Sequence, residues 1–167
     1  MFTTKRTAVE ASTVYDKNKL QLTDAKVTLP EITAQTADVQ IMGTASLPLL
    51  GLLEDMEATI SKTGIDKKST TLTKPGVHDI EVRWVQDVVK SDGATKQEGC
   101  KAFLKCIPKT IGPAADIEVG SIPEHDIAYT VLRYRLVVNG EEILLVDRTA
   151  GKLKVNGKDV VNYKKYL

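Results

Sequence analysis

The sequence predicts a mainly antiparallel β protein, because apolar and polar residues alternate along several segments and turn residues separate these segments. The clearest run, Ile127 to Val138, alternates up to Asn139-Gly140 and continues from Glu141 to Asp147. Asn-Gly between two such runs is a strong signal for a two-residue hairpin, since both turn positions need a positive φ. A second Asn-Gly pair at 156–157 and an alternating run from His78 to Val89 repeat the pattern. We therefore expect a sheet of hairpins rather than a nucleotide-binding βαβ pocket.

The Asn139-Gly140 turn also predicts the pairing of the longest hairpin, because the turn type determines which residues face each other across the two strands. This register would place Tyr134, Leu136, Ile143 and Leu145 in the core. The expected pairs are Leu136 with Ile143, Tyr134 with Leu145, and Arg135 with Leu144 on the other face.

The remaining elements follow from alternation and from turn residues. Residues 1–11 are rich in threonine and charge and lack periodicity, so we expect a flexible N-terminal arm followed by a single domain over 12–167. Prolines interrupt the span from Pro108 to Pro123, which predicts a loop or an edge strand there. We expect strands from Ser12 to a turn at Asp16-Lys17-Asn18, and then at 20–29, 32–41, 54–62, 78–89, 100–107, 127–138 and 141–147. Residues 66–72 are compatible with one or two helical turns without requiring them, and 159–167 are compatible with a short amphipathic helix.

The composition excludes several classes of function. The chain has 167 residues and a formal net charge of +1, which offers no bulk electrostatic basis for binding nucleic acid or a membrane surface. No apolar run approaches the ~20 residues that a membrane span needs. Lys5 and Arg6 are not followed by a hydrophobic segment, so we expect no secretory signal, no membrane anchor and folding in a cytoplasm.

The residues of catalytic and metal chemistry are sparse. Cys100 and Cys106 share one expected strand, in which six residues separate them by roughly 20 Å, too far for a disulfide. We expect both to be buried structural thiols. The two histidines, His78 and His125, lack the spacing and partners of a zinc site, and His125 is expected to be solvated in a loop beside Glu124. No phosphate loop or nucleophile elbow occurs, so we predict neither an enzyme nor a bound cofactor.

A leucine-rich segment stands out between two expected strands. It is broken by Pro48 and Gly51 and lies where a polar connection would be expected. One interpretation is that it folds back over the core of its own domain. The other is that it docks on a second subunit, since large exposed apolar patches mark interfaces. The candidate interface residues are Leu47, Leu49, Leu50, Leu52 and Leu53.

Several segments resemble the major tail tube family of contractile-tailed bacteriophages and phage-tail-like bacteriocins. They occur in the family's order, cover about half of the chain and span nearly all of it, although Lys67 to Pro75 lacks the apolar residues of the family's usual helix. The matching pieces are Val14 to Leu20, Ala25 to Ile32, Gly43 to Ile60, Tyr134 to Asp147 and Lys154 to Asp159.

The resemblance implies a β-barrel or sandwich of two packed sheets with one or two short helices. It implies that six subunits form a ring and that rings stack into a tube, which removes exposed strand edges. Surrounding sheath, baseplate or terminator proteins would be partners, and DNA would be non-specific cargo of the lumen if the particle is a phage. The particle would be a virion tail or a bacteriocin, assembled in the bacterial cytoplasm.

Two other interpretations are compatible with the same strands. One is the ring-forming tube protein of a bacterial secretion system. The other is a β-barrel that binds a small ligand in its mouth, although one Trp and two Phe offer little to line such a cavity. Rings or tubes seen by electron microscopy would favour a tube protein, whereas a uniform monomer would favour the ligand binder.

Overall fold

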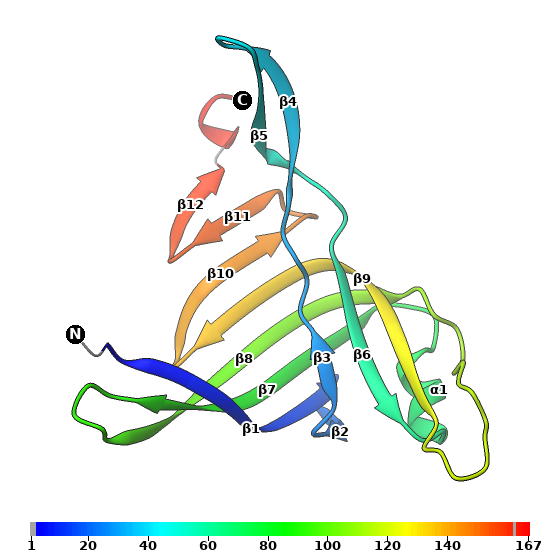
Figure 1. The fold of residues 1–167 in the computed structure, drawn as a ribbon. Coiled ribbons are helices and arrows are strands. Elements are labelled where there is room, and N and C mark those ends of the chain that lie inside the picture. Colours follow the sequence, from blue (N-terminus) through cyan, green and yellow to red (C-terminus); the bar gives the residue numbers. More distant parts are fainter. Residues whose placement is uncertain (1–2, 162) are drawn as a thin grey trace.

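The computed structural model, which describes residues 3–161 and 163–167, consists almost entirely of antiparallel strands (Figure 1). Ten strands form one hydrogen-bonded sheet, and two more form a separate hairpin. The described residues contain one α-helix, α1 (Lys67–Leu72), and one 3-10 turn, η1 (Tyr163–Lys165). The predicted mainly antiparallel β fold is therefore confirmed, with one short α-helix.

The large sheet follows the hydrogen-bonded order β12-β11-β10-β9-β8-β7-β1-β2. Its central strand β9 pairs with β8 along one edge and with both β10 and β6 along the other, and β6 in turn pairs with β3. These strands are β1 (Lys5–Asp16), β2 (Lys19–Thr23), β3 (Lys26–Thr28), β6 (Glu57–Thr63), β7 (His78–Val89), β8 (Thr95–Pro108), β9 (Glu124–Val138), β10 (Glu141–Asp147), β11 (Lys152–Val155) and β12 (Lys158–Val161).

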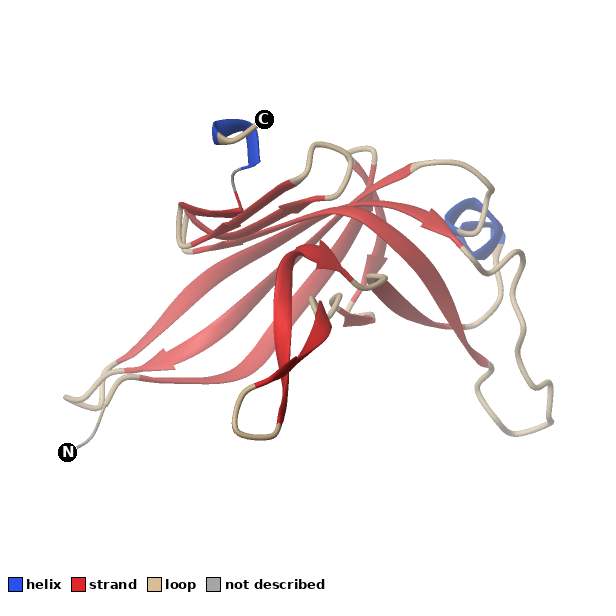
Figure 2. Cartoon of the chain, turned by 90° about the horizontal axis from the view of Figure 1, so that it is seen from above, coloured by secondary structure: helices blue, strands red, loops and turns tan. Residues whose placement is uncertain are grey.

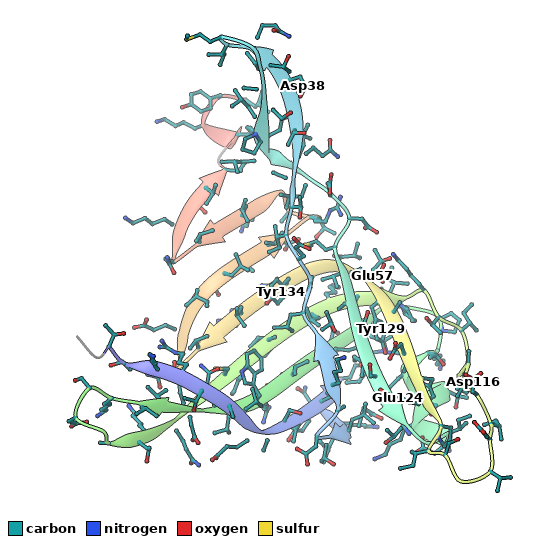
Figure 3. All side chains as sticks on the ribbon, in the orientation of Figure 1. Asp38, Glu57, Asp116, Glu124, Tyr129 and Tyr134 are labelled. Atoms are coloured by element: carbon teal, nitrogen blue, oxygen red, sulfur yellow. The ribbon has the colours of Figure 1, made fainter. Side chains whose placement is uncertain are left out.

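The core lies between β7–β9 and the strands β3 and β6, which cross in front of β7 and β8 in Figure 1. Met56, Ala58 and Ile60 share one fully buried face, as the alternation predicts. The two expected packed layers are thus parts of one curled sheet, because β9 pairs with strands of both. Tyr129 and Tyr134 of β9 point into this core (Figure 3). Burying each large apolar side chain contributes ~1.5–3 kcal/mol.

The Asn139-Gly140 turn has positive φ at both residues, 51° and 82°, as predicted. The expected register of its hairpin is wrong, because a β-bulge at Ile143 shifts every later pair by one residue. Residues 143–146 are all apolar, so alternation could not show which of them face inward. The bulge turns Val146 fully into the core and leaves Ile143 and Leu145 only partly buried. The observed pairs are Leu136 with Leu144, Arg135 with Leu145, and Tyr134 with Val146.

Residues 5–11, which the sequence assigns to a flexible arm, form the beginning of a strand. β1 begins at Lys5 and pairs with β7 from there onward, although residues 5–11 are all exposed. Their sequence shows no apolar periodicity because neither side of this part of the strand is buried. Arg6 forms an ion pair of 3.0 Å with Glu98, which is buried. The backbone of residues 5–11 is therefore strand, while the flexibility of residues 1–11 stays a prediction.

Two further segments differ from expectation at turns. The strand expected over 20–29 is divided into β2 and β3, because Asp24 adopts a left-handed φ of 53°. Its backbone N–H donates to the Ser12 carbonyl at 2.8 Å, which holds the break against β1. The helix expected over 159–167 is replaced by β12 and η1, since the Asn156-Gly157 turn folds the chain back onto β11. Residue 162 lies outside the described residues.

The sequence left open whether 66–72 form a helix, and the structure shows that Lys67–Leu72 do, as α1. Asp66 caps it by accepting from the backbone N–H of Ser69 at 3.1 Å, and the Ser69 hydroxyl accepts from the backbone N–H of Asp66. Leu72 is fully buried, and its carbonyl accepts a hydrogen bond of 2.8 Å from the Tyr129 hydroxyl. One buried apolar side chain and several polar contacts therefore hold a helix that has few hydrophobic residues of its own.

Candidate subunit interface

The leucine-rich segment is a strand rather than the expected loop. It forms β5 (Thr44–Leu53), which pairs with β4 (Ala34–Gln40) as a two-stranded sheet that projects from the body (Figure 1). Figure 2 shows the same hairpin standing clear of the large sheet. Met42 and Gly43 make the turn with φ of 47° and 118°. Pro48 is accommodated because a strand of a two-stranded sheet has an edge that needs no donor.

The hairpin is amphipathic along its paired length. Antiparallel pairing places opposite residues on the same face, so the register Ala37–Leu47 and Val39–Ala45 defines one apolar face. The other face is polar: the Ser46 hydroxyl donates to the Asp38 carboxylate at 2.5 Å. Asp38 lies near the outer end of the hairpin in Figure 3. The apolar face therefore has the composition of a core-facing surface, although its large side chains are exposed.

The five leucines divide into two groups. Leu47, Leu49, Leu50 and Leu52 are exposed, with 43%, 38%, 49% and 53% of their surface accessible. Leu53 is partly buried and packs against the core. The structure therefore supports folding back for the last leucine only, and leaves the other four side chains open to solvent.

The base of the hairpin is held by the body. The Arg148 guanidinium donates to the backbone carbonyls of Glu54 and Leu53 at 3.2 and 3.4 Å. Gly51 lies so close to the Tyr163 ring that a Cβ atom there would sit 1.4 Å from the phenol oxygen. The C-terminal turn η1 thus packs where the hairpin lacks a side chain, and only the outer part of the hairpin is left without contacts to the rest of the described chain.

A charge cluster lies next to this base. The Lys109 ammonium contacts the Glu57 carboxylate at 2.8 Å and the Asp55 carboxylate at 3.4 Å. The hydrogen bond with Glu57 raises the pKa of Lys109 above its ordinary value. Arg148 lies 3.6 Å from Asp55, so the acidic residues that follow β5 are neutralised by cations of the body. These pairs are exposed and each contributes little to stability, but they fix the direction in which the chain leaves the hairpin.

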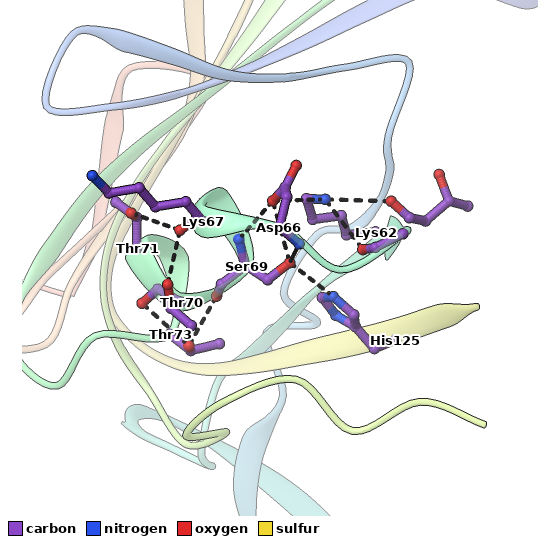
Figure 4. A network of polar contacts seen from close by, with 10 residues as sticks. Lys62, Asp66, Lys67, Ser69, Thr70, Thr71, Thr73 and His125 are labelled. Carbon is purple, nitrogen blue, oxygen red and sulfur yellow. Dashed lines mark hydrogen bonds and ion pairs between the residues drawn. The ribbon is translucent and has the colours of Figure 1, made fainter. Parts of the chain in front are cut away.

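The residues considered for catalysis are structural. His125 lies in β9 and is buried, which corrects the expectation of a solvated loop residue. Its Nε2 is 3.2 Å from the Ser69 hydroxyl, in the network of α1 shown in Figure 4. The prolines nearby suggested a loop, but β6 pairs with β9 up to Glu124 and carries His125 into the sheet.

The two cysteines are free and buried, as predicted. Burial raises the pKa of both thiols. Over the residues that the structure describes, no group of three or more His, Cys, Asp or Glu side chains is placed to hold a metal ion. Within the same residues, no helix is long and apolar enough to cross a membrane.

A sequence signal for the hairpin existed but was obscured. Residues 44–49 alternate polar and apolar, and Gly43 marks a turn after the preceding strand. Pro48 and the unbroken Leu52-Leu53 pair pointed instead to a loop. The alternation of polar and apolar residues in β4 and β5 is hard to recognise in the sequence, because neither strand has a fully buried face made of large apolar residues.

Comparisons with known proteins agree with this architecture. A family model described as phage tail tube protein FII matches residues 6–165. A sheath/tube terminator of an extracellular contractile injection system, PVC, has the same fold with a TM-score of 0.52 and 14% identity, covering 78% of this chain and 96% of that one. A chain of the PVC sheath-tube complex matches with a TM-score of 0.49 and 14% identity, over 75% of this chain and 87% of that one. The comparison with curated proteins gives no match.

The family match extends over nearly the whole chain, from β1 to the C-terminal turn. It includes the projecting hairpin as well as the curled sheet, so the exposed leucines lie within the matched region. The family is one of structural proteins rather than enzymes. Both histidines and both cysteines of this chain are buried. The chain belongs to the phage tail tube protein FII family, and it is a tail tube subunit.

Proposed function

We propose that six copies of this chain close into a ring and that such rings stack into the hollow inner tube of a contractile particle. The family match over residues 6–165 is the observation that carries this proposal. Inside a contractile sheath, the tube conveys DNA or punctures the target envelope. The fold shared with the tube terminator of an extracellular contractile injection system supports the same kind of particle.

Open strand edges support assembly from many copies. Among the described strands, β12 and β2 end the hydrogen-bonded path of the large sheet, and residues 6–11 of β1 pair with β7 as their only described partner strand. Exposed edges present backbone donors and acceptors that pair readily with another chain. A ring of head-to-tail contacts satisfies such edges in every subunit and leaves none open around the circumference.

The partners follow from the proposed position of the tube. A sheath protein would surround it, and baseplate or terminator proteins would contact its ends. DNA would pass through the lumen as non-specific cargo if the particle carries a genome, since the net charge of +1 offers no strong attraction. The protein would act in a virion tail or a bacteriocin particle that is assembled in the bacterial cytoplasm.

Electron microscopy of the purified protein tests the proposal. We expect rings of six subunits and, at higher concentration, tubes of stacked rings. Light scattering on the same samples should give six times the chain mass for the ring. A uniform monomer at all concentrations would contradict the proposal, and specific binding of a small apolar ligand by that monomer would instead favour a ligand-binding barrel.

A double variant tests the role of the leucines. Leu50→Asp with Leu52→Asp should give a folded, β-rich monomer, because both side chains are exposed and their replacement disturbs no core packing. It should fail to stack rings, since two carboxylates would be buried without partners. Circular dichroism checks the fold and electron microscopy the assembly. The matched control, Leu50→Met with Leu52→Met, should assemble; tubes of normal length from the Asp variant would refute the docking role.

A further inference from the structure

A buried carboxyl–imidazole pair joins three segments of the chain at the start of β7. His78 Nδ1 lies 2.6 Å from Asp16 Oδ2, and His78 Nε2 lies 2.7 Å from the backbone carbonyl oxygen of Lys74. Both side chains of the pair are only 8% exposed. Asp16 ends β1, His78 begins β7, and Lys74 belongs to the connection between α1 and β7. The imidazole ring therefore ties this connection to the end of β1.

The hydrogen-bond geometry determines how many protons the pair holds. A carbonyl oxygen can only accept, so His78 Nε2 carries a proton and donates it to the Lys74 oxygen. A second proton must lie between His78 Nδ1 and Asp16 Oδ2, on one or the other, because two lone pairs at 2.6 Å would repel each other. The pair thus holds one proton more than a neutral histidine beside an ionised carboxylate, and its net charge is zero.

The interior around the pair offers nothing that would compensate a charge. Asp16 Oδ1 is buried and has no hydrogen-bond partner among the described residues. Tyr129 of β9 presents its ring 6.3 Å from the His78 ring, and the Cys106 thiol of β8 contacts the His78 carbonyl at 3.8 Å. Burial raises the pKa of both Tyr129 and Cys106, so both are uncharged at neutral pH. Loss of the second proton would therefore leave an unbalanced negative charge in the core, which is costly.

The charged residues beside the pair are exposed to solvent. Lys19 of β2 lies opposite Asp16 in the β1–β2 ladder, Asp79 follows His78 in β7, and Lys74 follows α1. Water and salt screen charges at the surface, so these residues compensate a buried charge only weakly.

We propose that Asp16 and His78 retain the second proton at neutral pH, that this proton fastens the α1–β7 connection to β1, and that its loss at alkaline pH releases the connection. A neutral imidazole donates through one nitrogen only, so either Lys74 or Asp16 would then face a lone pair. Residues 73–77 have no strand pairing to hold them in its place. The device lies within one chain and is independent of the proposed tube function.

The direction of the pH effect follows from counting protons in the folded and unfolded states. In the unfolded chain an exposed histidine loses its proton near the ordinary pKa of ~6.5, and an exposed aspartate is ionised above ~3.9. Between these values both states hold the same number of protons, and the stabilisation by the pair is constant. Above ~6.5 the folded state holds one proton more, so stability falls as the pH rises until the folded protein releases that proton as well.

Asp16→Asn tests the count, because its amide can donate to Nδ1 of a neutral ring while Nε2 still donates to Lys74. The variant needs no second proton. Above pH ~6.5 the unfolding equilibrium constant of the parent in urea should rise relative to that of Asp16→Asn, by about tenfold per pH unit. His125 is present in both proteins, so its own titration cancels. Asp79→Asn, which removes an exposed carboxylate, is the matched control and should keep the slope of the parent.

Hydrogen exchange of the parent locates the effect and needs no variant. The Thr73 backbone N–H donates to the Ser69 carbonyl at 3.3 Å at the end of α1. Its protection, corrected for base catalysis, should fall with rising pH at a fixed low protein concentration, whereas amides in the β7–β8 ladder should keep theirs. Loss of protection confined to the end of α1 supports release of the connection.

Three results would overturn the proposal. Equal pH slopes for the parent and Asp16→Asn would show that the pair retains no additional proton. Protection of Thr73 that does not change with pH would show that the proton does not hold the connection. Equal losses in α1 and in the β7–β8 ladder would show that the whole fold responds. Should Asp16→Asn fail to fold, the exchange data of the parent still decide, and none of these results depends on whether rings form.

Discussion

Cys106 shows at the scale of one residue how burial controls reactivity. Its side chain is fully buried in β8, and burial, together with the nearby Asp16 and Asp79 carboxylates, raises the pKa of the thiol to about 12. A thiol with a raised pKa stays protonated at neutral pH, and only the thiolate attacks thiol reagents and disulfides. Cys100 is buried in the same strand, and its pKa is raised for the same main reason.

We therefore predict that both cysteines stay reduced and that assembly does not depend on reductant. At pH 8 the native protein should react with Ellman's reagent only as fast as it unfolds, whereas both thiols should react at once in denaturant. Reaction should accelerate only as the pH approaches the raised pKa. A disulfide found by mass spectrometry of assembled particles, or rapid reaction of the native protein at pH 8, would contradict this.

Gly140 has room for a side chain but the wrong backbone geometry for one. No atom lies within 4 Å of a Cβ built at this position, yet φ is 82°. Gly140→Val should therefore lower the free energy of unfolding by ~1–3 kcal/mol, through backbone strain rather than through a clash. Urea unfolding measures the change. Because a ring repeats the defect in every subunit, assembly should suffer more than monomer folding.

The matched control at this turn is Gly140→Asn. Asparagine tolerates a positive φ better than a β-branched residue does, as Asn139 and Asn156 already illustrate. It should lose much less stability than the valine variant. If Gly140→Val melts like the parent and polymerises normally, the turn does not control the geometry of the β9–β10 hairpin.

At the scale of the element, α1 depends on a polar network rather than on apolar residues of the helix itself (Figure 4). Ser69 is fully buried and contacts the Asp66 backbone N–H and His125 Nε2. The other ring nitrogen of His125, Nδ1, is buried without a hydrogen-bond partner among the described residues. Ser69 therefore provides the only hydrogen bond that the described residues offer to the His125 ring.

Ser69→Ala should lower the free energy of unfolding by ~1–3 kcal/mol, because it leaves a buried imidazole unsatisfied on both sides. Thr70→Ala is the matched control: Thr70 is exposed and its hydroxyl donates only to the Lys67 carbonyl, so its loss should be small. Urea unfolding of both variants gives the comparison. Equal effects would show that the contact with His125 contributes nothing beyond the local helix.

The elements also differ in how far the sequence predicts them. His78 to Val89 appears in the structure with the predicted bounds, because side chains from His78 to Arg83 alternate between the core and a more exposed face and the sequence records this alternation. The β4–β5 hairpin lacks such a contrast, since both of its faces are exposed to some degree. Residues 5–11 of β1 likewise leave no apolar pattern, and only pairing with β7 reveals them as strand.

The whole molecule depends on its first strand more than the sequence suggests. Deleting residues 1–11 would remove the first half of β1 and would leave the corresponding edge of β7 without its partner strand. It would also leave the buried Glu98 carboxylate without Arg6. We expect the truncated protein to fold with a lower melting temperature and to form no tubes.

Scanning calorimetry and electron microscopy measure these two effects. Arg6→Ala, which removes the ion pair but keeps the strand, separates them: it should lower the melting temperature slightly and still assemble. A truncated protein that melts like the parent and forms normal tubes would show that residues 1–11 behave as the flexible arm expected from their composition.

The sequence by itself determined the antiparallel β class, the positions of most strands, the two Asn-Gly turns and the buried, free state of the cysteines. These features depend on local conformation or on alternation between core and solvent, which neighbouring residues encode directly. The family followed from ordered motifs in the same way.

The tertiary structure alone decided the bulge at Ile143, the burial of His125, and the exposure of four leucines on a projecting hairpin. Each depends on pairing between residues far apart in the chain. Where a segment is apolar throughout, as at 143–146, several registers have similar local patterns and the core selects among them. Where a segment is exposed throughout, as at 5–11, no pattern exists, and backbone hydrogen bonds to a distant strand determine the structure.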